Sequence, residues 1–333
     1  MNIVNKKQIN IPTAIVFFAR PDLLKVTFEA VRKAKPNQLF LIQDGARVNN
    51  AADHEKILAC QKIVEDIDWE CEVFRNYSSE NLGCGMRVFS GISWAFQYTN
   101  RLLILEDDCV PSLSLFPFVS ELLEKYQHDD RIGMISGMNN LGVYPECPND
   151  YFFTTSGSIW GWATWKRVWD KVEYDLDFLN DKYATHVVYK TDPKLRPMGQ
   201  VLFDKFKNGE KLSSWSYQLG MAILLNHQLN IVPKYNMISN IGMSEDGANS
   251  VSSLRFMPKG LRRLYYMKTY DYKFPLQHPK YVVNDLDFKK RLDRVMGDGY
   301  PFIQFFRKVE SILYRIIGGD YKSLVKGLKK RLN

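Results

Sequence analysis

Apolar runs and amphipathic stretches alternate along the first hundred residues of this chain. The runs, rich in Ile, Val, Leu and Phe, are bounded by polar or turn-forming residues, which is typical of buried strands. The stretches between them carry apolar residues at helical spacing. We predict strands over residues 14–18, 38–42, 70–75 and 102–105, and helices over about 23–33, 54–67 and 86–98. This alternation predicts an α/β fold, with a mostly parallel sheet covered by helices on both faces.

Three consecutive carboxylates, Glu106, Asp107 and Asp108, follow directly after the strand at 102–105. Neighbouring carboxylates repel one another, so this placement costs stability unless a cation or hydrogen-bond donors occupy the site. Oxygen ligands of this kind suit hard divalent ions such as Mn²⁺ or Mg²⁺. We therefore predict a metal site here. The alternative is a solvated acidic turn, because short acidic runs are common on protein surfaces.

Polar residues at the ends of three predicted strands point to one crevice. In open α/β sheets, ligands bind beyond the carboxyl ends of the strands. Asp44 follows the second strand, the loop 81–83 follows the third, and the three carboxylates follow the fourth. The sequence therefore predicts that these segments converge on one ligand site.

Composition limits the class of protein. With 333 residues, 45% hydrophobic and 14% aromatic, the chain can bury a large core. The five cysteines are odd in number and contain no C-x-x-C pair, so we expect reduced packing residues and no disulfide framework. No apolar run approaches the roughly 20 residues that span a bilayer, and the start lacks the apolar region of a signal peptide. We expect a cytoplasmic protein, or one at the inner face of the cell membrane.

The net charge of +8 is concentrated after residue 302, so we expect no nucleic acid partner. Apolar residues at helical spacing form one stripe over 305–317 and a second over 321–332, with Lys and Arg between them. Basic amphipathic helices of this kind are typical of attachment to an anionic membrane surface. The alternative is that both stripes dock on the rest of the protein, and the sequence leaves the two open.

The order of these parts resembles the glycosyltransferase A fold, and most closely the N-acetylglucosaminyltransferase I type and related bacterial surface-glycan glycosyltransferases. The resemblance extends over about 11–250. Its motifs are Phe18-Ala19-Arg20, Ile42-Gln43-Asp44-Gly45, the segment 81–87, Ile104-Leu105-Glu106-Asp107-Asp108, and the segments 135–140 and 157–165.

The resemblance implies roles for the donor side. Ala19 and Arg20 would contact the nucleotide, and Asp44 would accept hydrogen bonds from uracil or ribose. Arg87 would face the diphosphate, for which a guanidinium fork is geometrically suited. For Arg20 and Arg87 the alternative is an ordinary surface or structural salt bridge.

The same resemblance makes Asp108 the direct ligand of Mn²⁺ or Mg²⁺. Glu106 and Asp107 would hold ribose, sugar hydroxyls or metal-bound water. The ion would neutralise charge on the diphosphate as the bond from sugar to phosphate breaks.

Two further segments belong to the acceptor side. Trp162, Trp165 and Trp169 lie at helical spacing, which favours a buried stripe. Trp160 precedes Gly161 at a predicted loop-to-helix junction, where an indole ring can stack on a sugar, so we place these two residues near the acceptor.

The base that an inverting transferase needs is the point of departure from the family. The resembling proteins carry it as the acid of a Trp-Asp-Tyr-Gln segment, which here reads Trp215-Ser216-Tyr217-Gln218. A serine is no base at neutral pH without its own activator. Glu245 or Asp246 is the nearest substitute, although both also fit an acidic turn stabilised by Gly247.

The sequence thus predicts a catalytic domain over 11–250, with a nucleotide-sugar half at about 11–110 and an acceptor half at about 111–250. An extension of unknown role follows over 251–300, and a basic helical tail over 301–333. We expect a metal-dependent, inverting glycosyltransferase that takes a uridine diphosphate sugar (UDP-sugar) to a glycan or lipid-linked glycan. The alternatives are a degenerate binding protein, indicated by Ser216, and a sugar nucleotidyltransferase, for which the first strand lacks a Gly-rich loop.

Overall fold

The computed structural model describes residues 9–191, 195–210, 212, 215–243, 253–321 and 325. Its first hundred residues follow the predicted alternation of strands and helices, which is thereby confirmed. The elements are β1 (Ile9–Phe17), α1 (Pro21–Ala34), β2 (Pro36–Gln43), α2 (Ala51–Val64), β3 (Glu72–Tyr77), α3 (Cys84–Ala95) and β4 (Arg101–Glu106).

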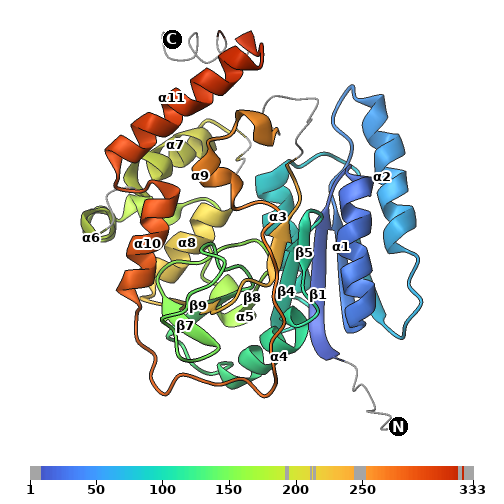
Figure 1. Ribbon diagram of the computed structural model, residues 1–333. Helices are drawn as coiled ribbons and strands as arrows, with labels where there is room; N and C mark the ends of the chain where they lie inside the picture. The colour runs from blue at the N-terminus through green and yellow to red at the C-terminus, as the bar shows by residue number, and fades with distance from the viewer. Residues whose placement is uncertain are drawn as a thin grey trace.

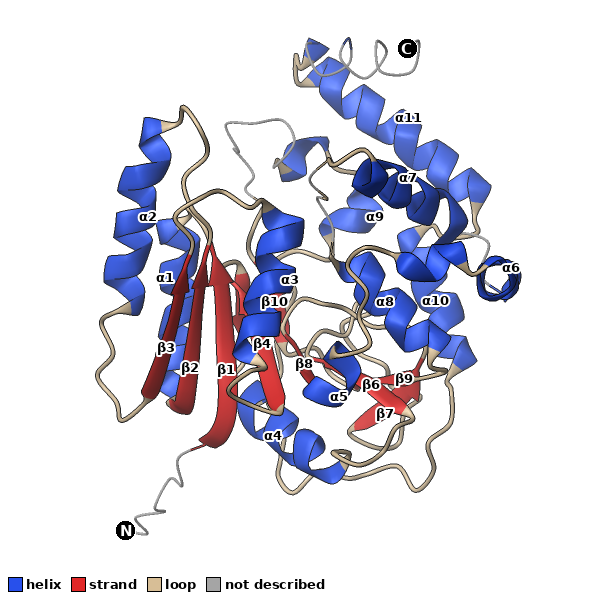
Figure 2. Ribbon diagram, turned by 180° about the vertical axis from the view of Figure 1, so that it is seen from behind, coloured by secondary structure: helices blue, strands red, loops and turns tan. Residues whose placement is uncertain are grey.

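An eight-stranded sheet runs through the molecule in the order β3-β2-β1-β4-β8-β6-β9-β7. The first four strands are parallel, β8 lies antiparallel to both β4 and β6, and β7 is antiparallel to β9. Helices α1 and α2 lie on one face of the parallel part and α3 on the other (Figures 1 and 2). The remaining strands are β5 (Cys109–Pro111), β6 (Ile132–Ser136), β7 (Tyr151–Thr154), β8 (Trp162–Trp165), β9 (Leu229–Pro233) and β10 (Ile238–Asn240).

The register of β1 fixes which residues meet at the end of the sheet. Val16 pairs with Ile42 on one side and with Glu106 on the other. These strands are buried on both faces, which is why they read as continuous apolar runs. The residues that follow them, among them Asp44 and Asp107, therefore leave the sheet side by side.

Helix α1 shows how local sequence supports this arrangement. Pro21 stands at its start, where a missing N–H costs no hydrogen bond. Its inner face buries Leu24, Phe28 and Val31, and each such side chain contributes roughly 1.5–3 kcal/mol through burial. The helix ends at Lys35, whose left-handed backbone lets its N–H donate to the carbonyl of Val31.

The tryptophan stripe is buried as predicted, but its helical geometry is wrong. Trp162 and Trp165 lie in the strand β8, and Trp169 ends the one-turn helix α5 (Lys166–Trp169). All three side chains are buried. Trp162 stacks on Trp215, while the indole of Trp165 donates to the carbonyl of Leu123 at 3.0 Å. The pairing of β8 between β4 and β6 overrides the helical spacing, because cross-strand contacts are not visible in local periodicity.

Further helices cover the acceptor half. They are α4 (Leu115–Lys125), the short 3₁₀ helix η1 (Asp177–Asn180), α6 (Lys182–Thr191), α7 (Leu195–Lys207) and α8 (Ser216–Leu225). A separate apolar cluster, with Leu176, Leu202, Leu212 and Met221 at its centre, holds α6, α7 and α8 together.

The segment after 250 runs back along the sheet. The amide of Tyr270 donates to the carbonyl of Asn236, and the amide of Asp285 to that of Phe153. A helical tail was predicted only from residue 301, and it is confirmed over 301–317; the segment also forms helices that were not predicted. Its helices are η2 (Leu254–Phe256), α9 (Lys259–Arg262), α10 (Leu286–Met296) and α11 (Pro301–Ile317).

Helix α11 carries the first predicted tail stripe, and none of its residues is buried. Polar contacts attach its inner face, where Arg307 donates to the carbonyls of Val295 and Met296 and Ser311 donates to that of Phe256. Phe302 is 80% exposed and Phe306 66%. Docking of this stripe on the core is therefore excluded. The second stripe lies outside the described residues except for Tyr321 and Val325, and no helix in the described ranges is long and apolar enough to cross a membrane.

Candidate functional site

Asp107 lies at the centre of the crevice where the parallel strands end. Its amide donates to the carbonyl of Val16 at 3.1 Å, which continues the pairing of β4 with β1 for one residue. Thr27 of α1 donates its hydroxyl to the carbonyl of Asp107 at 3.0 Å. The side chain is only 2% exposed and accepts from the amide of Phe18. The backbone therefore holds this carboxylate in a fixed position.

Arg20 is the cation of this cluster. Its Nε donates to Asp107 at 3.2 Å and its Nη1 to Asp108 at 2.9 Å, while Nη2 also contacts Asp107. Burial disfavours the charged guanidinium, but the two carboxylates outweigh it and raise the pKa of Arg20. The repulsion that the sequence assigned to a metal ion is thus relieved by a residue of the chain. The salt-bridge alternative holds for Arg20.

Glu106 stands apart from this pairing. Its desolvation, followed by the charges of Asp108 and Asp107, raises its pKa to about 8. The crevice therefore combines two carboxylates paired with Arg20 and a third that holds a proton near neutral pH.

Asp44 anchors the loop that follows β3. Its two oxygens accept from the amides of Gly45, Leu82 and Gly83 and from the side chain of Asn81, all within 3.0 Å. A side chain on Gly45 would meet the backbone of Glu80 at 2.5 Å, so only glycine allows this approach. The predicted contact of Asp44 with uracil or ribose would use carboxylate oxygens that already accept hydrogen bonds from four donors.

Arg87 is buried on α3, with 4% of its surface exposed. It donates to the carbonyl and side-chain oxygens of Asn76, the latter at 2.8 Å. Its Nε is buried without an acceptor, and Arg87 forms no ion pair with any residue that the structure describes. Desolvation lowers its pKa, against the charge of Asp44. Arg87 is thus buried and not a surface salt bridge; Asp44 acts on it only through its charge, and its Nε is left without an acceptor among the described residues.

These residues line one cavity of about 360 Å³, which we name the strand-end cavity. Its walls include Arg20, Asp44, Arg87, Glu106 and Asp107, five of the six residues predicted to contact the nucleotide. The sixth, Ala19, is half-buried in the connection between β1 and α1. The sequence therefore grouped these residues correctly, although nothing in the structure tests their roles.

Asp108 lies at the edge of the crevice. Besides Arg20 it contacts the amide group of Asn240 at 3.3 Å, and its carbonyl accepts from the amide of Ile241 at 2.9 Å. A side chain on Gly242 would come within 2.1 Å of its carboxylate, so the backbone after β10 lies directly over it.

Within the described ranges, no group of three or more His, Cys, Asp or Glu side chains is arranged to hold a metal ion. A closed protein cage for Mn²⁺ or Mg²⁺ is therefore not formed by those residues. The donor set still fits ions of this type, because Mg²⁺ commonly binds to one or two carboxylates together with substrate phosphates and water. Asp108 is the carboxylate placed for such an open site.

On the acceptor side, Gly161 lies at the start of β8 next to the strand-end residues. Its left-handed backbone, with φ of 62°, and its contact with Ile238 leave no room for a side chain. The half-buried ring of Trp160 packs on Tyr265, with ring centroids 5.2 Å apart. The predicted junction is thus from loop to strand, not from loop to helix.

Of the three predicted base positions only Ser216 is described by the structure, and it does not line the strand-end cavity. Ser216 begins α8 and lines a different cavity, which α10 also borders. Glu245 and Asp246 lie outside the described residues.

Tyr265 and Asn240 are residues of this site that the sequence reasoning missed. Desolvation, followed by the charge of Asp108, raises the pKa of Tyr265. Asn240 pairs with Tyr265 through a short β-bridge. Both come from segments without a motif, so no local signal could have marked them.

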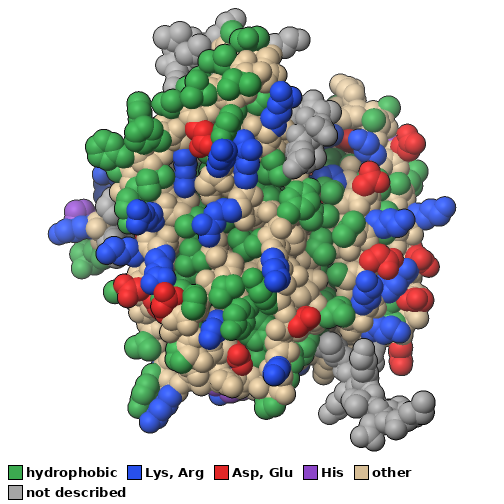
Figure 3. Space-filling model, in the orientation of Figure 1, with side chains coloured by type: hydrophobic (Ala, Val, Ile, Leu, Met, Phe, Trp, Pro, Cys, Tyr) green, Lys and Arg blue, Asp and Glu red, His purple; other side chains and the backbone are tan. Residues whose placement is uncertain are grey.

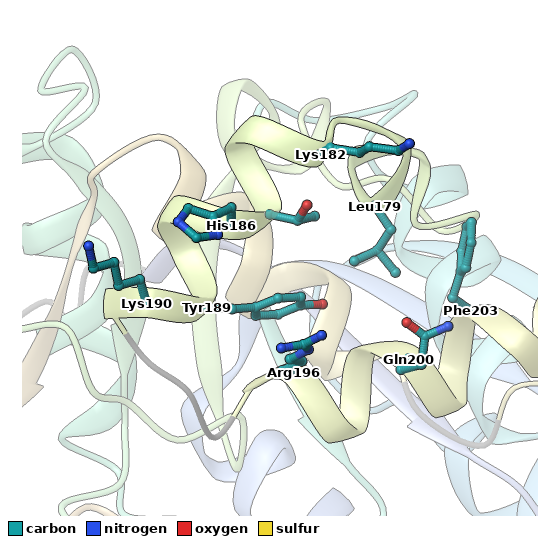
Figure 4. Close-up of a pocket in the computed structure, with 9 residues that line it drawn as sticks. Leu179, Lys182, His186, Tyr189, Lys190, Arg196, Gln200 and Phe203 are labelled. Atoms are coloured by element: carbon teal, nitrogen blue, oxygen red, sulfur yellow. The ribbon is translucent and has the colours of Figure 1, made fainter.

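A second surface hollow lies among η1, α6 and α7 (Figure 4). Tyr189 of α6 and Arg196 of α7 face each other there, and Lys182, His186 and Lys190 complete a basic lining. No carboxylate lines it among the described residues, and all its walls come from the helical acceptor half. It is therefore separate from the strand-end cavity.

No protein-family model matches the chain, and no curated protein matches it. Distant similarity to three solved structures was found. They are UDP-glucose pyrophosphorylase complexed with UDP-glucose (10% identity, TM-score 0.37, covering 68% of this chain and 91% of that chain), the inositol-1-phosphate CTP transferase from T. maritima (12%, 0.38, 78% and 96%) and 4-diphosphocytidyl-2C-methyl-D-erythritol synthase from Anaerococcus prevotii DSM 20548 (16%, 0.32, 65% and 95%). None of these three is named as a glycosyltransferase.

Proposed function

We propose that this protein is a metal-dependent, inverting glycosyltransferase that moves a sugar from a UDP-sugar to a bacterial surface-glycan acceptor. The observation that carries the proposal is the strand-end cavity, in which the Nε of the buried Arg87 has no acceptor among the described residues and in whose lining Arg87 stands with Asp44, Glu106 and Asp107. Such a cavity combines a place for an anionic group with oxygens for a cation or sugar hydroxyls.

Arg87 would hold the donor diphosphate. Its free Nε offers a hydrogen bond to a phosphate oxygen, and the low polarity around it strengthens that contact. Arg20 would approach the same diphosphate from the opposite wall, since its side chain is the more exposed of the two. Donor binding would then change the balance of the Arg20 ion pairs with Asp107 and Asp108.

Asp108 would be the protein ligand for Mn²⁺ or Mg²⁺, and an ion bound there would neutralise charge on the leaving diphosphate. Asp107 is held by Arg20 and by the amide of Phe18, so it would orient Arg20 and sugar hydroxyls. Glu106, whose pKa is about 8, would donate as well as accept hydrogen bonds at neutral pH.

Proton removal from the acceptor would be carried out by Glu245 or Asp246. The segment that holds them follows the backbone at Gly242, which lies over Asp108. Ser216 at the family's base position favours the alternative of a degenerate protein that binds nucleotide-sugar or glycan without turnover. Measurement of donor hydrolysis and transfer separates these two.

A nucleotidyltransferase, as in the three distant structures, is the less favoured alternative. The connection from β1 to α1 is Phe18, Ala19 and Arg20, and it contains no glycine. Pro21 then occupies the first turn of α1, where its missing N–H removes one donor for a triphosphate.

Thermal stabilisation by UDP with and without Mn²⁺ tests the proposal, because a ligand that binds only the native state raises the Tm. We expect Mn²⁺-dependent stabilisation that is lost in Arg87→Met. The control is Arg131→Met, which removes an exposed guanidinium far from the strand ends. Equal stabilisation of all three proteins, or of none, contradicts the proposal.

We further propose that α11 attaches the enzyme to an anionic membrane on its cytoplasmic side. Figure 3 shows apolar side chains gathered over α11, with Lys and Arg side chains nearby. The carboxyl ends of β1, β2 and β3 point to the same end of the molecule as α11 (Figures 1 and 2). Attachment through α11 would therefore bring the strand-end cavity toward the membrane and favour a lipid-linked acceptor.

The test is sedimentation with vesicles of phosphatidylcholine alone or mixed with phosphatidylglycerol. The full chain is expected to bind the anionic vesicles in a salt-sensitive manner, and Phe302→Ser/Phe306→Ser to lose most of this binding. The matched control is Val48→Ser/Leu58→Ser. It removes two similarly exposed apolar side chains, one from the loop before α2 and one from α2 itself. If this control loses binding to the same extent, the assignment to α11 is wrong.

A further inference from the structure

A cavity of about 630 Å³ lies between the loop that precedes β8, the helix α8 and the helix α10. We name it the α10 cavity. It shares Trp160 with the acceptor side of the candidate site, whereas Lys289, Asp293 and Met296 come from the segment after 250. That segment carries no sequence motif, so its contribution to a cavity is new information from the fold.

The floor of the α10 cavity contains a buried polar group that needs a partner. Asn230 of β9 is 4% exposed, and its Oδ1 is buried without a donor in the structure as described. Gly157 lies directly above it, since a side chain there would approach the Nδ2 of Asn230 to 3.1 Å. An unsatisfied buried amide oxygen destabilises the fold, and a ligand hydroxyl that donates to it would relieve that cost.

The rim adds groups that suit a sugar. Ser156, Ser158 and Asn140 line the cavity, and the Nδ2 of Asn140 contacts only the sulfur of Met138, at 3.8 Å, among the described atoms. Trp160 offers an indole edge beside them, and its other side packs on Tyr265. Hydroxyl-binding groups next to an aromatic ring favour a carbohydrate over a purely apolar ligand.

Helix α10 is fixed in place by its own sequence. Asp285 caps it by accepting from the amide of Phe288 at 2.8 Å and also accepts from the hydroxyl of Tyr144. Phe288 and Leu292 pack on Tyr144 and Phe152, so this face of the helix is buried. Lys289, Asp293 and Met296 follow at helical spacing on the face that borders the cavity.

Lys289 and Asp293 form an ion pair at 2.8 Å across one turn of α10. Such a pair offers both donors and acceptors to neighbouring hydroxyls, while a lone charge would select for charged ligands. The chemistry of this wall therefore matches a neutral, hydroxyl-rich ligand.

The α10 cavity connects to the candidate catalytic groups through two contacts. Tyr265 packs on the ring of Trp160 and forms a β-bridge with Asn240, whose side chain contacts the carboxylate of Asp108 at 3.3 Å. A side chain on Gly161, the residue after Trp160, would come within 3.4 Å of Leu105, one residue before Glu106. A ligand in the cavity would thus reach toward the strand-end residues from the side opposite Arg87.

We propose that the α10 cavity binds the acceptor glycan and that α10 supplies the specificity-determining residues Lys289 and Asp293. This inference rests on the proposed function, because only a glycan transferase needs a second sugar site beside its donor. The extension after 250 would then be a part of the acceptor site and not an independent module.

The test uses an array of defined oligosaccharides, followed by fluorescence titration of the best binder against the full chain. We expect a roughly 10-fold or greater loss of affinity in Lys289→Ala and in Asp293→Asn, and a loss of the tryptophan signal in Trp160→Phe. The matched control is Lys290→Ala, the next residue of α10, which is exposed and does not line the cavity. UDP stabilisation is expected to be unchanged in all four variants.

Two results would overturn this inference. One is that the unmodified protein binds no oligosaccharide of the array; the other is that Lys289→Ala and Asp293→Asn bind as the Lys290→Ala control does. Failure of the proposed function has a different signature, since UDP would then give no stabilisation while glycan binding could still depend on α10. If one variant has a lower Tm, its loss of glycan binding reflects a destabilised fold. Glycan binding by the other α10 variant then tests the inference.

Discussion

The strand-end cavity takes its charged groups from one stretch of chain, Arg20 to Asp107, whereas the α10 cavity combines residues from Met134 to Asp298. In the strand-end cavity, the residues that follow neighbouring parallel strands lie close together, and the ion pairs of Arg20 connect these residues. In the α10 cavity, loop residues, two strands and the helices α7, α8 and α10 meet, and α10 is brought there by the extension that returns to the sheet. Local sequence therefore describes one cavity well and the other hardly at all.

This difference predicts that charge changes dominate in the strand-end cavity. Asp108→Ala should lower transfer by about 10³-fold, because it removes the one carboxylate placed for an open metal site. The fold should persist, since Arg20 still pairs with Asp107. Transfer rates at several Mn²⁺ concentrations measure the effect, and an unchanged metal dependence in Asp108→Ala would rule out the assignment.

The base is predicted to lie on the segment that follows Gly242 and not at Ser216. Glu245→Gln or Asp246→Asn should lower turnover by about 10²-fold with little change in UDP affinity. Ser216→Asp is the complementary variant. Should that variant raise turnover while both amide variants leave it unchanged, the degenerate alternative is the better description.

Around the α10 cavity, we expect the packing of buried side chains to contribute more to the free energy of unfolding than charged groups do. Phe288→Ala should lower the free energy of unfolding by about 3 kcal/mol, because Phe288 is fully buried between Tyr144 and Phe152. Urea unfolding followed by fluorescence measures this loss. The control is Phe274→Ala, whose side chain is 40% exposed, and a similar loss in both variants would show that α10 is not held by this contact.

The smallest expected effect concerns the loop after β2. Hydrogen bonds from Arg47 hold the pKa of Asp53 at about 2, against the smaller and opposite effect of desolvation. A depressed carboxyl pKa stabilises the fold above the ordinary value near 4, and this stability is lost as pH falls toward 2. Because Arg47 is largely exposed, solvent screens its ion pair with Asp53. We expect the pair to contribute only about 1 kcal/mol to the free energy of unfolding.

Comparison of the unmodified protein with Asp53→Asn by urea unfolding between pH 6 and pH 2 checks this value. The difference in unfolding free energy between the two proteins should shrink as the pH falls. A constant difference would mean that Asp53 acts through its shape and not through its charge.

Several features of the donor half could be predicted because they depend on neighbours in sequence. The strand before Glu106 is an apolar run, and Pro21 marks the start of α1 by its own geometry. The convergence of Asp44 and Asp107 also follows, since parallel strands end at the same edge of a sheet, whereas the place of Arg87 beside them was implied only by the resemblance. The ion pairs of Arg20 with Asp107 and Asp108 could not be predicted, because the reach of Arg20 across the strand ends depends on side-chain geometry that no spacing reveals.

The acceptor half was decided by contacts between distant segments. Trp162 and Trp165 have helical spacing but lie in β8, because pairing with β4 and β6 outweighs local preference. Ser216 falls in the α10 cavity, and Tyr265, from a segment that has no motif, pairs with Asn240 beside Asp108.

The sequence by itself determined the alternation of strands and helices, the α/β fold and the group of residues at the strand ends. Each of these depends on periodicity or on a strand and the residue after it. The tertiary structure alone decided that Arg20 neutralises the carboxylates, that α10 borders a cavity, and that the apolar face of α11 stays exposed. The physical reason is that these features arise from packing and ion pairs between segments far apart in the chain, which leave no local pattern.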